Sequence, residues 1–204
     1  MQLLADKGNG NHAYIDQLNE AKKVLVSEFG GTLFTVAKDV KLQVAFDPQK
    51  VASYRLVGYE NRLLNKEDFE DDTKDAGELG AGHTITALYE IVPGHERQSD
   101  APPAEVRLRY KLPDGVRSQE MQATVPFRPD SFGQASVDLR WAAAVAEFAM
   151  LLRQSEHRGI ADFTHCEQLA RQAQGRDPFG YRAEMIRMIQ AATVIDSDSA
   201  APSE

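Results

Sequence analysis

The chain has 204 residues, of which 42% are hydrophobic and 26% are charged, the balance of an ordinary globular protein with one or two domains. Its net charge of −8 opposes binding to a phosphate backbone or an anionic membrane surface, so nucleic acid is not an expected partner. The single cysteine, Cys166, excludes an internal disulfide, and no apolar run approaches the roughly 20 residues that span a bilayer, so we expect no membrane insertion by this segment.

Residues 1–31 have the pattern of a domain's end. The sequence predicts a short strand at 12–15, followed by a helix over 17–29 that Asp16 caps and two glycines, Gly30 and Gly31, terminate. Its apolar positions share one helical face: Leu18, Ala21, Leu25 and Phe29. This α/β repeat has no sheet of its own to join, so we expect the strand to pair with another sheet edge.

Residues 32–130 change to the period-two pattern of strands with one wet face, which favours an antiparallel sheet and sandwich-like packing. The expected strands are 41–46, 54–59, 84–91, 105–111 and 119–127. In the first of them, Leu42 and Val44 are expected to face the core, and Lys41 and Gln43 to face water.

Two long loops interrupt these strands. Residues 65–83 contain an acidic cluster over 67–78 and then three glycines, and residues 93–104 are rich in proline. Both have the composition of surface loops.

Residues 131–195 are expected to form about three helices. Capping boxes are indicated at Ser131 with Gln134 and at Thr164 with Glu167, and the pair Asp177 and Pro178 suits the start of the last helix. Apolar stripes are expected at Trp141, Val145, Phe148 and Leu152, and at Tyr181, Met185, Met188 and Ala192. The polar tail, residues 196–204, is expected to be disordered.

Several stretches resemble one bacterial family. Residues 4–16 and 18–25 resemble the last strand and last helix of a bacterial von Willebrand factor type A domain. The remaining stretches resemble the C-terminal region attached to that domain; they are residues 33–46, 54–62, 75–90 and 177–184.

The resemblance implies a larger parent protein in the cell envelope, with an upstream lipoprotein-type signal and a complete type A domain that holds a divalent cation. The cation motif Asp-x-Ser-x-Ser is not matched here, because Asp198 stands where the run from Asp196 needs its first Ser. No metal ligand is therefore carried over, and no cofactor is expected in this chain. If the chain were the complete protein, a cytoplasmic location would be expected.

The loop residues allow alternative interpretations. The acidic cluster 67–78 suggests Ca²⁺, but it lacks the spacing of a calcium loop, so a solvated loop is favoured. The glycines from Gly77 to Gly82 suggest a phosphate cradle, but His83 and a strand follow them where a Walker loop needs Gly-Lys-Ser/Thr, so a turn or bulge is favoured.

The residues of the helical part also allow alternative interpretations. His165 and Cys166 are adjacent on a helix and point about 100° apart, so a buried, unreactive cysteine is favoured over a nucleophile with its base. The histidines show no zinc-ligand spacing. The Trp141 stripe suits core packing better than the docking of a partner helix.

The sequence thus predicts an α+β protein in four parts: a type A remnant at 1–31, a β-sandwich-like module at 32–130, a helical module at 131–195 and the tail at 196–204. No catalytic, cofactor-binding or metal-binding residue is assigned. We expect a non-catalytic accessory module that contacts other proteins in an adhesion or scaffold role. The alternative is a small ligand-binding domain or hydrolase whose site forms no motif. A convergent pocket with a perturbed acid or base would favour that alternative, and an exposed apolar patch the first function.

Overall fold

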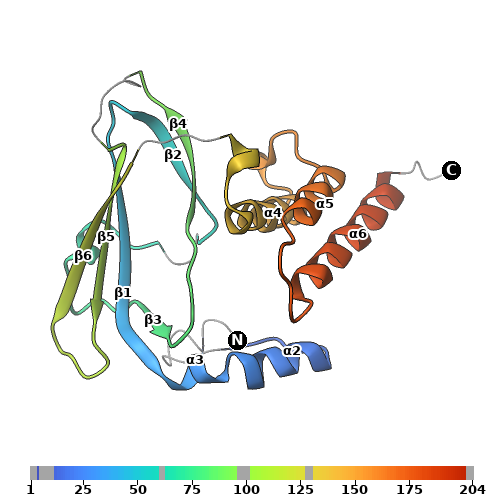
Figure 1. The fold of residues 1–204 in the computed structure, drawn as a ribbon. Helices are drawn as coiled ribbons and strands as arrows, with labels where there is room; N and C mark the ends of the chain where they lie inside the picture. Colours follow the sequence, from blue (N-terminus) through green and yellow to red (C-terminus); the bar gives the residue numbers. More distant parts are fainter. Residues whose placement is uncertain (1–3, 5–11, 60–62, 96–101, 127–130, 201–204) are drawn as a thin grey trace. The chain divides into compact units, whose positions relative to one another are not determined.

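The computed structural model describes residues 4, 12–59, 63–95, 102–126 and 131–200 (Figure 1). The helical elements are α2 (Leu18–Lys22), η1 (Lys23–Ser27), α3 (Phe29–Leu33), η3 (Glu67–Phe69), η4 (Phe132–Gln134), α4 (Val137–Leu152), η5 (Glu156–Arg158), α5 (Phe163–Gln172) and α6 (Tyr181–Ala200). The strands are β1 (Thr35–Phe46), β2 (Val51–Val57), β3 (Gly77–Gly80), β4 (Leu88–Pro93), β5 (Ala104–Lys111) and β6 (Ser118–Val125). The predicted α+β class is confirmed.

The chain divides into two compact units. The first contains residues 1–54, 59–85 and 91–127, and the second contains residues 55–58, 86–90 and 128–204. The division differs from the predicted modules, because the described part of residues 1–31 lies in the same unit as the long strands. Parts of β2 and β4 belong to the unit that contains α4, α5 and α6.

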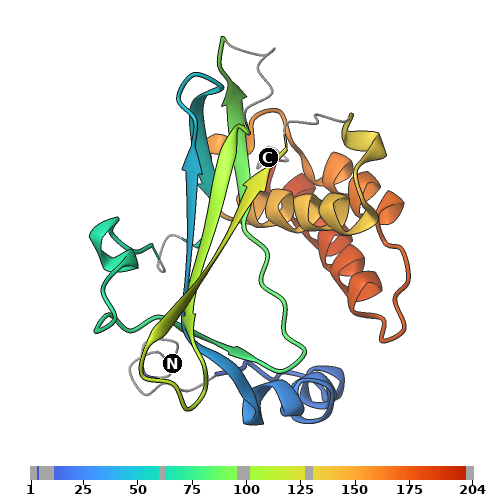
Figure 2. The same ribbon diagram turned by 60° about the vertical axis from the view of Figure 1, so that its left-hand side comes forward.

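The first unit is built on a four-stranded sheet with the strand order β3-β1-β5-β6. Each neighbouring pair is antiparallel, and β1, β5 and β6 lie side by side along most of their length (Figure 2). Cross-strand partners place Leu42, Leu108 and Met121 in one row on one face of the sheet. Lys41, Arg109 and Glu120 form the neighbouring row on the opposite face.

The burial of β1 corrects the predicted orientation of this sheet. Lys41, expected to face water, is 2% exposed, and Leu42, expected to face the core, is 49% exposed. The reason is that the loop after β2 returns over the polar face and covers Lys41 with backbone carbonyls. Asp39 has φ +51, and the pairing with β5 shifts between Lys38 and Lys41, so β1 is irregular at this point.

The shorter strands differ from their predicted bounds. β2 overlaps the predicted strand at 54–59 but begins three residues earlier and ends two residues earlier, and β4 begins four residues after the predicted start at 84; the two pair as a separate two-stranded sheet. β3 occupies glycine-rich residues for which a turn or bulge was predicted. A Cβ on Gly80 would lie 1.7 Å from the carbonyl oxygen of Gly31, so this close approach between α3 and β3 requires glycine.

The N-terminal predictions are corrected in three respects. Residues 12–15 form no strand, and Tyr14 is 80% exposed. The helix is capped by Gln17 without a side-chain hydrogen bond, not by Asp16. It is interrupted by the π-helical turn η1 and then continues through Gly30 and Gly31 to Leu33, so the glycines do not end it.

The second unit has its core among α4, α5 and α6, the three predicted helices. The buried cluster consists of Ala144, Leu151, Cys166, Ala170, Met185, Ile186 and Ile189, with Trp141 and Phe148 partly buried against it. Trp141 and Phe148 therefore pack as predicted, but the buried stripe continues through Ala144 and Leu151. Val145 and Leu152, predicted in the stripe, are 42% and 58% exposed. None of the helices in the described residues is long and apolar enough to cross a membrane.

The helix starts also differ from the predicted capping boxes. Ser136 caps α4 by accepting from the Leu139 N–H, and Asp162 caps α5 by accepting from the His165 N–H. Asp177 does accept from the backbone of the last helix, at the Ala183 N–H, but α6 begins only at Tyr181. Met188, predicted in its stripe, is 52% exposed.

The predicted disordered tail is corrected as well. The helix α6 continues to Ala200, so residues 196–200 are helical. Residues 201–204 lie outside the described part of the chain.

Candidate functional site

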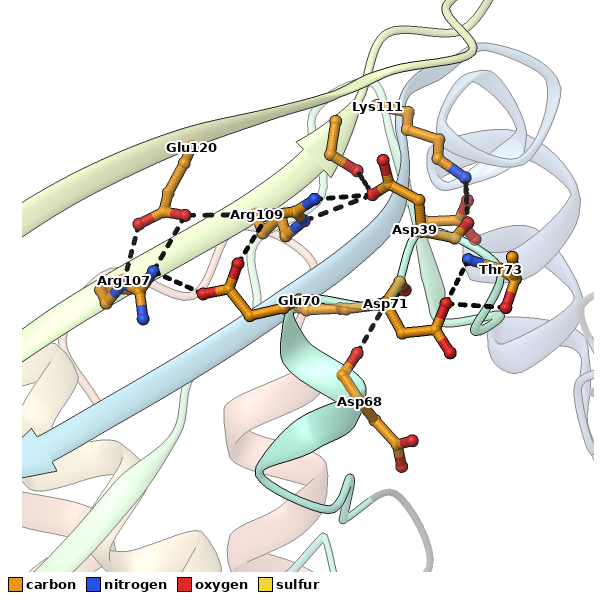
Figure 3. A network of polar contacts seen from close by, with 12 residues as sticks. Asp39, Asp68, Glu70, Asp71, Thr73, Arg107, Arg109, Lys111 and Glu120 are labelled. Atoms are coloured by element: carbon orange, nitrogen blue, oxygen red, sulfur yellow. Dashed lines mark hydrogen bonds and ion pairs between the residues drawn. The ribbon is translucent and has the colours of Figure 1, made fainter.

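The densest group of polar contacts lies where the acidic loop crosses the polar face of the sheet (Figure 3). Alternate residues of β5 project from that face, so Arg107, Arg109 and Lys111 form a row of cations. The short helix η3 and the residues after it bring carboxylates against this row. The loop was predicted to be solvated, and the side chains of Glu70 and Asp72 are 62% and 42% exposed; ion pairs in addition bind the loop to the sheet.

Two arginines share the carboxylates. The Arg107 guanidinium donates to Glu120 Oε1 at 2.7 Å and to Glu70 Oε1 at 2.9 Å, and it lies 4.8 Å over the Phe69 ring. Arg109 donates to Asp72 Oδ1 at 2.9 Å and to the second Glu70 oxygen at 3.4 Å. Figure 3 shows Glu70 between the two guanidinium groups.

Two lysines hold the loop through its backbone. Lys41 Nζ donates to the carbonyl oxygen of Asp68 at 3.0 Å and to that of Asp71. Lys111 Nζ donates to Asp39 Oδ2 at 2.7 Å and to the Asp72 carbonyl oxygen at 2.8 Å. Because the lysines bind main-chain oxygens, they fix the path of the loop and also offset its negative charge.

The network changes the protonation equilibria of its members. Hydrogen bonds from the Ser118 hydroxyl and the Arg109 guanidinium lower the pKa of Asp72 to about 2. The hydrogen bond from Arg107 lowers the pKa of Glu120, and the same contact raises the pKa of Arg107. The hydrogen bond to Asp39 raises the pKa of Lys111.

We call this network the clamp, because Lys41, Arg107, Arg109 and Lys111 of the sheet bind the loop over residues 68–72. Lys41, Arg107, Arg109 and Lys111 each contact a carboxylate or a carbonyl group, and the lowered pKa values of Asp72 and Glu120 favour their ionised form. The arrangement stabilises the loop, and it offers a ligand no set of free donors. The sequence contains both halves of this network, but they lie 35 to 40 residues apart. One half is the row of cations at alternate positions of β5, and the other is the acidic loop that precedes it in the chain.

In the second unit, a largely buried carboxylate beside the core contacts a histidine. His165 Nδ1 lies 2.8 Å from Oε1 of Glu147, which is on α4 and is only 9% exposed. This hydrogen bond raises the pKa of His165. The Cys166 thiol donates to the Ala144 carbonyl oxygen, with its Sγ 3.5 Å away, and its burial raises the pKa of the thiol to about 12. The predicted burial of this cysteine is confirmed.

A cavity of about 320 Å³ lies between the N-terminal helices and the residues after β3. Its polar side chains come from Ser27 and Glu28 on one segment and from His83 and Thr84 on the other. Of the three glycines from Gly77 to Gly82, only Gly82 lies in its wall. Within the described ranges, no three His, Cys, Asp or Glu side chains are grouped so that they could hold a metal ion.

The face of the sheet opposite the clamp is apolar and partly exposed. Three cross-strand rows form this apolar face, and its members are Leu42, Leu108 and Met121; Val44, Val106 and Ala123; Phe46, Ala104 and Val125. Met121 is 58% exposed and Val125 is 39% exposed. Only one end has a described aromatic cover, where the Tyr54 ring lies 4.4 Å from that of Phe46.

Comparisons with known proteins show which family the chain belongs to. Residues 31–195 match the family model described as "Uncharacterized protein YfbK, C-terminal". The chain is also 43% identical over 209 residues to the "Uncharacterized protein YfbK" of Escherichia coli (strain K12), a match that covers 94% of this chain and 36% of that protein. The chain thus spans about a third of the length of this curated relative, and no solved structure matches it. The chain belongs to the YfbK C-terminal family.

Proposed function

We propose that this chain is a non-catalytic module that contacts other proteins within a larger bacterial protein of the von Willebrand factor type A class, in an adhesion or scaffold role at the cell envelope. The observation that carries the proposal is the open apolar face of the sheet. Apolar side chains stand in register there across three strands, and those at the two sides of the face, Leu42 on β1 and Met121 and Val125 on β6, are exposed, as on a surface that a protein partner covers.

The size of this face fits an interaction surface. Three strands about 4.8 Å apart and about seven residues long, with a rise of about 3.3 Å per residue, give a footprint on the order of 300 Å². Apolar patches of this size on monomers often have a function. Leu42 and Met121 lie at the two ends of one of its rows, on β1 and β6, and both are about half exposed. The clamp on the other side fills the polar face, so the two faces have different roles.

The N-terminal helices support the link to a larger protein. Leu18, Leu25 and Phe29, which share the apolar face of the N-terminal helix, are 69%, 60% and 51% exposed, so this stripe is uncovered. Residues 1–30 precede the range that the family model matches, and about two thirds of the E. coli relative lies outside its match to this chain. A preceding type A domain, packed on this stripe, accounts for both observations.

The experiment that tests this function uses the full-length parent protein as bait. Met121→Glu places a charge on the apolar face, and Gln122→Glu places the same charge on the other face of the same strand. We expect Met121→Glu to lose proteins that the wild type and Gln122→Glu both capture, as identified by mass spectrometry. Capture that EDTA abolishes indicates a cation in the type A domain. An identical set of proteins with both variants would contradict the proposal.

The cavity beside His83 favours the second candidate function, binding of a small polar ligand. Its wall joins Ser27 and Glu28 to His83 and Thr84, so hydroxyl, carboxylate and imidazole groups surround one space. A panel of polar metabolites in a thermal-shift assay tests it. A ligand of this site raises the melting temperature of the wild type and not of His83→Ala; a panel without such a compound leaves the interaction function as the better account.

A further inference from the structure

The two edges of the four-stranded sheet differ in how they are protected. At one edge β3 has four residues, pairs irregularly with β1 and contacts α3 closely through Gly80 and Gly31. At the other edge β6 has eight residues that pair with β5 without a register shift. Among the described residues, β5 is the only strand that pairs with β6.

We propose that β6 is a docking edge to which an extended segment of another protein adds as a further strand. This inference deepens the interaction role proposed above and rests on it. Main-chain groups on the outer side of an edge strand are ready to pair with such a segment, and proteins usually block them with lysine, proline or a bulge. Residues 118–125 contain no lysine and no proline, and they pair without a bulge.

The charge on this strand does not block the edge either. Glu120 is the only charged residue between Ser118 and Val125. It bonds Arg107 through both carboxylate oxygens, at 2.7 and 3.1 Å, so it is held against the polar face. The remaining side chains are neutral.

The side chains beside the edge define the partner's pattern. Met121, Ala123 and Val125 project from the apolar face and are exposed, and Gln122 and Thr124 project from the other face. An added strand continues both faces of the sheet. The segment that fits therefore alternates apolar and polar residues, with its apolar side continuing the rows of Leu108 and Val106.

A second copy of the chain fits this edge less well than a separate segment. Each copy carries a net charge of −8, so two copies repel each other, whereas a neutral or basic segment does not meet this repulsion. A stable dimer buries about 800 Å² on each partner, and one eight-residue edge supplies much less. We therefore assign the edge to a neutral or basic extended segment of a different protein.

The probe is a synthetic ten-residue peptide of alternating valine and threonine with a lysine at each end. Hydrogen exchange of the chain is followed with and without saturating peptide. We expect the outward amides of β6 to exchange at least tenfold more slowly with peptide, and those of β3 to remain unchanged. The matched control peptide carries N-methyl groups on alternate residues of its pairing edge, which removes donors without altering the side chains. Equal slowing by both peptides, or none by either, would overturn the inference.

Two protein variants separate this inference from the proposed function. Ala123→Lys puts a lysine beside the edge on the apolar face, and Thr124→Lys puts the same charge on the polar face. We expect the first to weaken peptide binding at least tenfold by fluorescence anisotropy and the second to change it less than threefold. If β6 shows no peptide protection while Met121→Glu still loses captured proteins, the docking edge is wrong and the interaction role stands. Concentration-dependent dimerisation that protects β6 without peptide would assign the edge to a second copy and overturn the inference.

Discussion

The buried ammonium group of Lys41 offers the sharpest test of the clamp between loop and sheet. The side chain is 2% exposed, and its Nζ donates to the backbone carbonyls of Asp68 and Asp71. Lys41→Met retains the length of the apolar stem but removes the charge and both donors. Hydrogen bonds to charged groups contribute about 1.5–3 kcal/mol each, and the loop carbonyls regain part of this from water after the change.

We therefore expect Lys41→Met to lower the free energy of unfolding of the sheet unit by about 3 kcal/mol. For a chain of this size that corresponds to a fall in Tm of roughly 6–12 °C. Far-UV circular dichroism in a denaturant titration measures the loss, and hydrogen exchange locates it in residues 65–76. The fluorescence of Trp141, the single tryptophan, reports on the helical unit and should keep its midpoint.

The matched control is Lys22→Met, the same substitution at an exposed lysine of α2. Surface changes of this kind shift stability by about 0.5 kcal/mol or less. If the two variants lose the same stability, Lys41 does not anchor the loop, and the argument from its burial and its carbonyl partners is refuted.

Three further predictions concern charge and packing. The hydrogen bond to Glu147 raises the pKa of His165, so the pair stabilises the fold below about pH 6.5, and this stabilisation is lost as the pH rises through the raised pKa. The free energy of unfolding of the wild type should therefore be lower at pH 8.5 than at pH 5.5, and the difference should be smaller in His165→Gln. The pKa of Asp72 is lowered to about 2, so its ionised carboxylate stabilises the fold above the ordinary pKa of 3.8, and this stabilisation is lost as the pH falls. In an acid titration followed by circular dichroism, the wild type should lose more stability between pH 5 and pH 2 than Asp72→Asn. Ile189 is fully buried, so Ile189→Ala should cost about 2–5 kcal/mol in denaturant, whereas Met188→Ala, at a 52% exposed neighbour, should cost far less.

The period-two patterns were the most informative part of the sequence. They located β5 and β6 to within two residues of their ends, because alternation along one strand needs no knowledge of the rest of the chain. The pattern also separated the two faces of the sheet correctly. It misassigned which face is covered, because the cover comes from a loop whose carboxylates meet Arg107 and Arg109 only in three dimensions.

Other errors have equally local causes. Gly77 and Gly80 suggested a turn, since the sequence does not reveal that α3 must approach β3 more closely than a Cβ allows. Ser131 and Thr164 have the residue types of a capping box, but α4 and α5 begin directly after Ser136 and Asp162, and these two residues are the N-caps. The small polar residues 196–200 gave no sign that α6 extends through them.

Oxidation of the methionines by dilute peroxide, followed by mass spectrometry, tests the openness of the apolar face most directly. Met121 is 58% exposed on that face, and Met185, 9% exposed in the helical core, is the internal standard for a buried methionine. The structure predicts that Met121 of the folded chain oxidises many times faster than Met185. Equal, slow oxidation of the two would mean that the face is already covered within this chain, which contradicts the proposed binding surface.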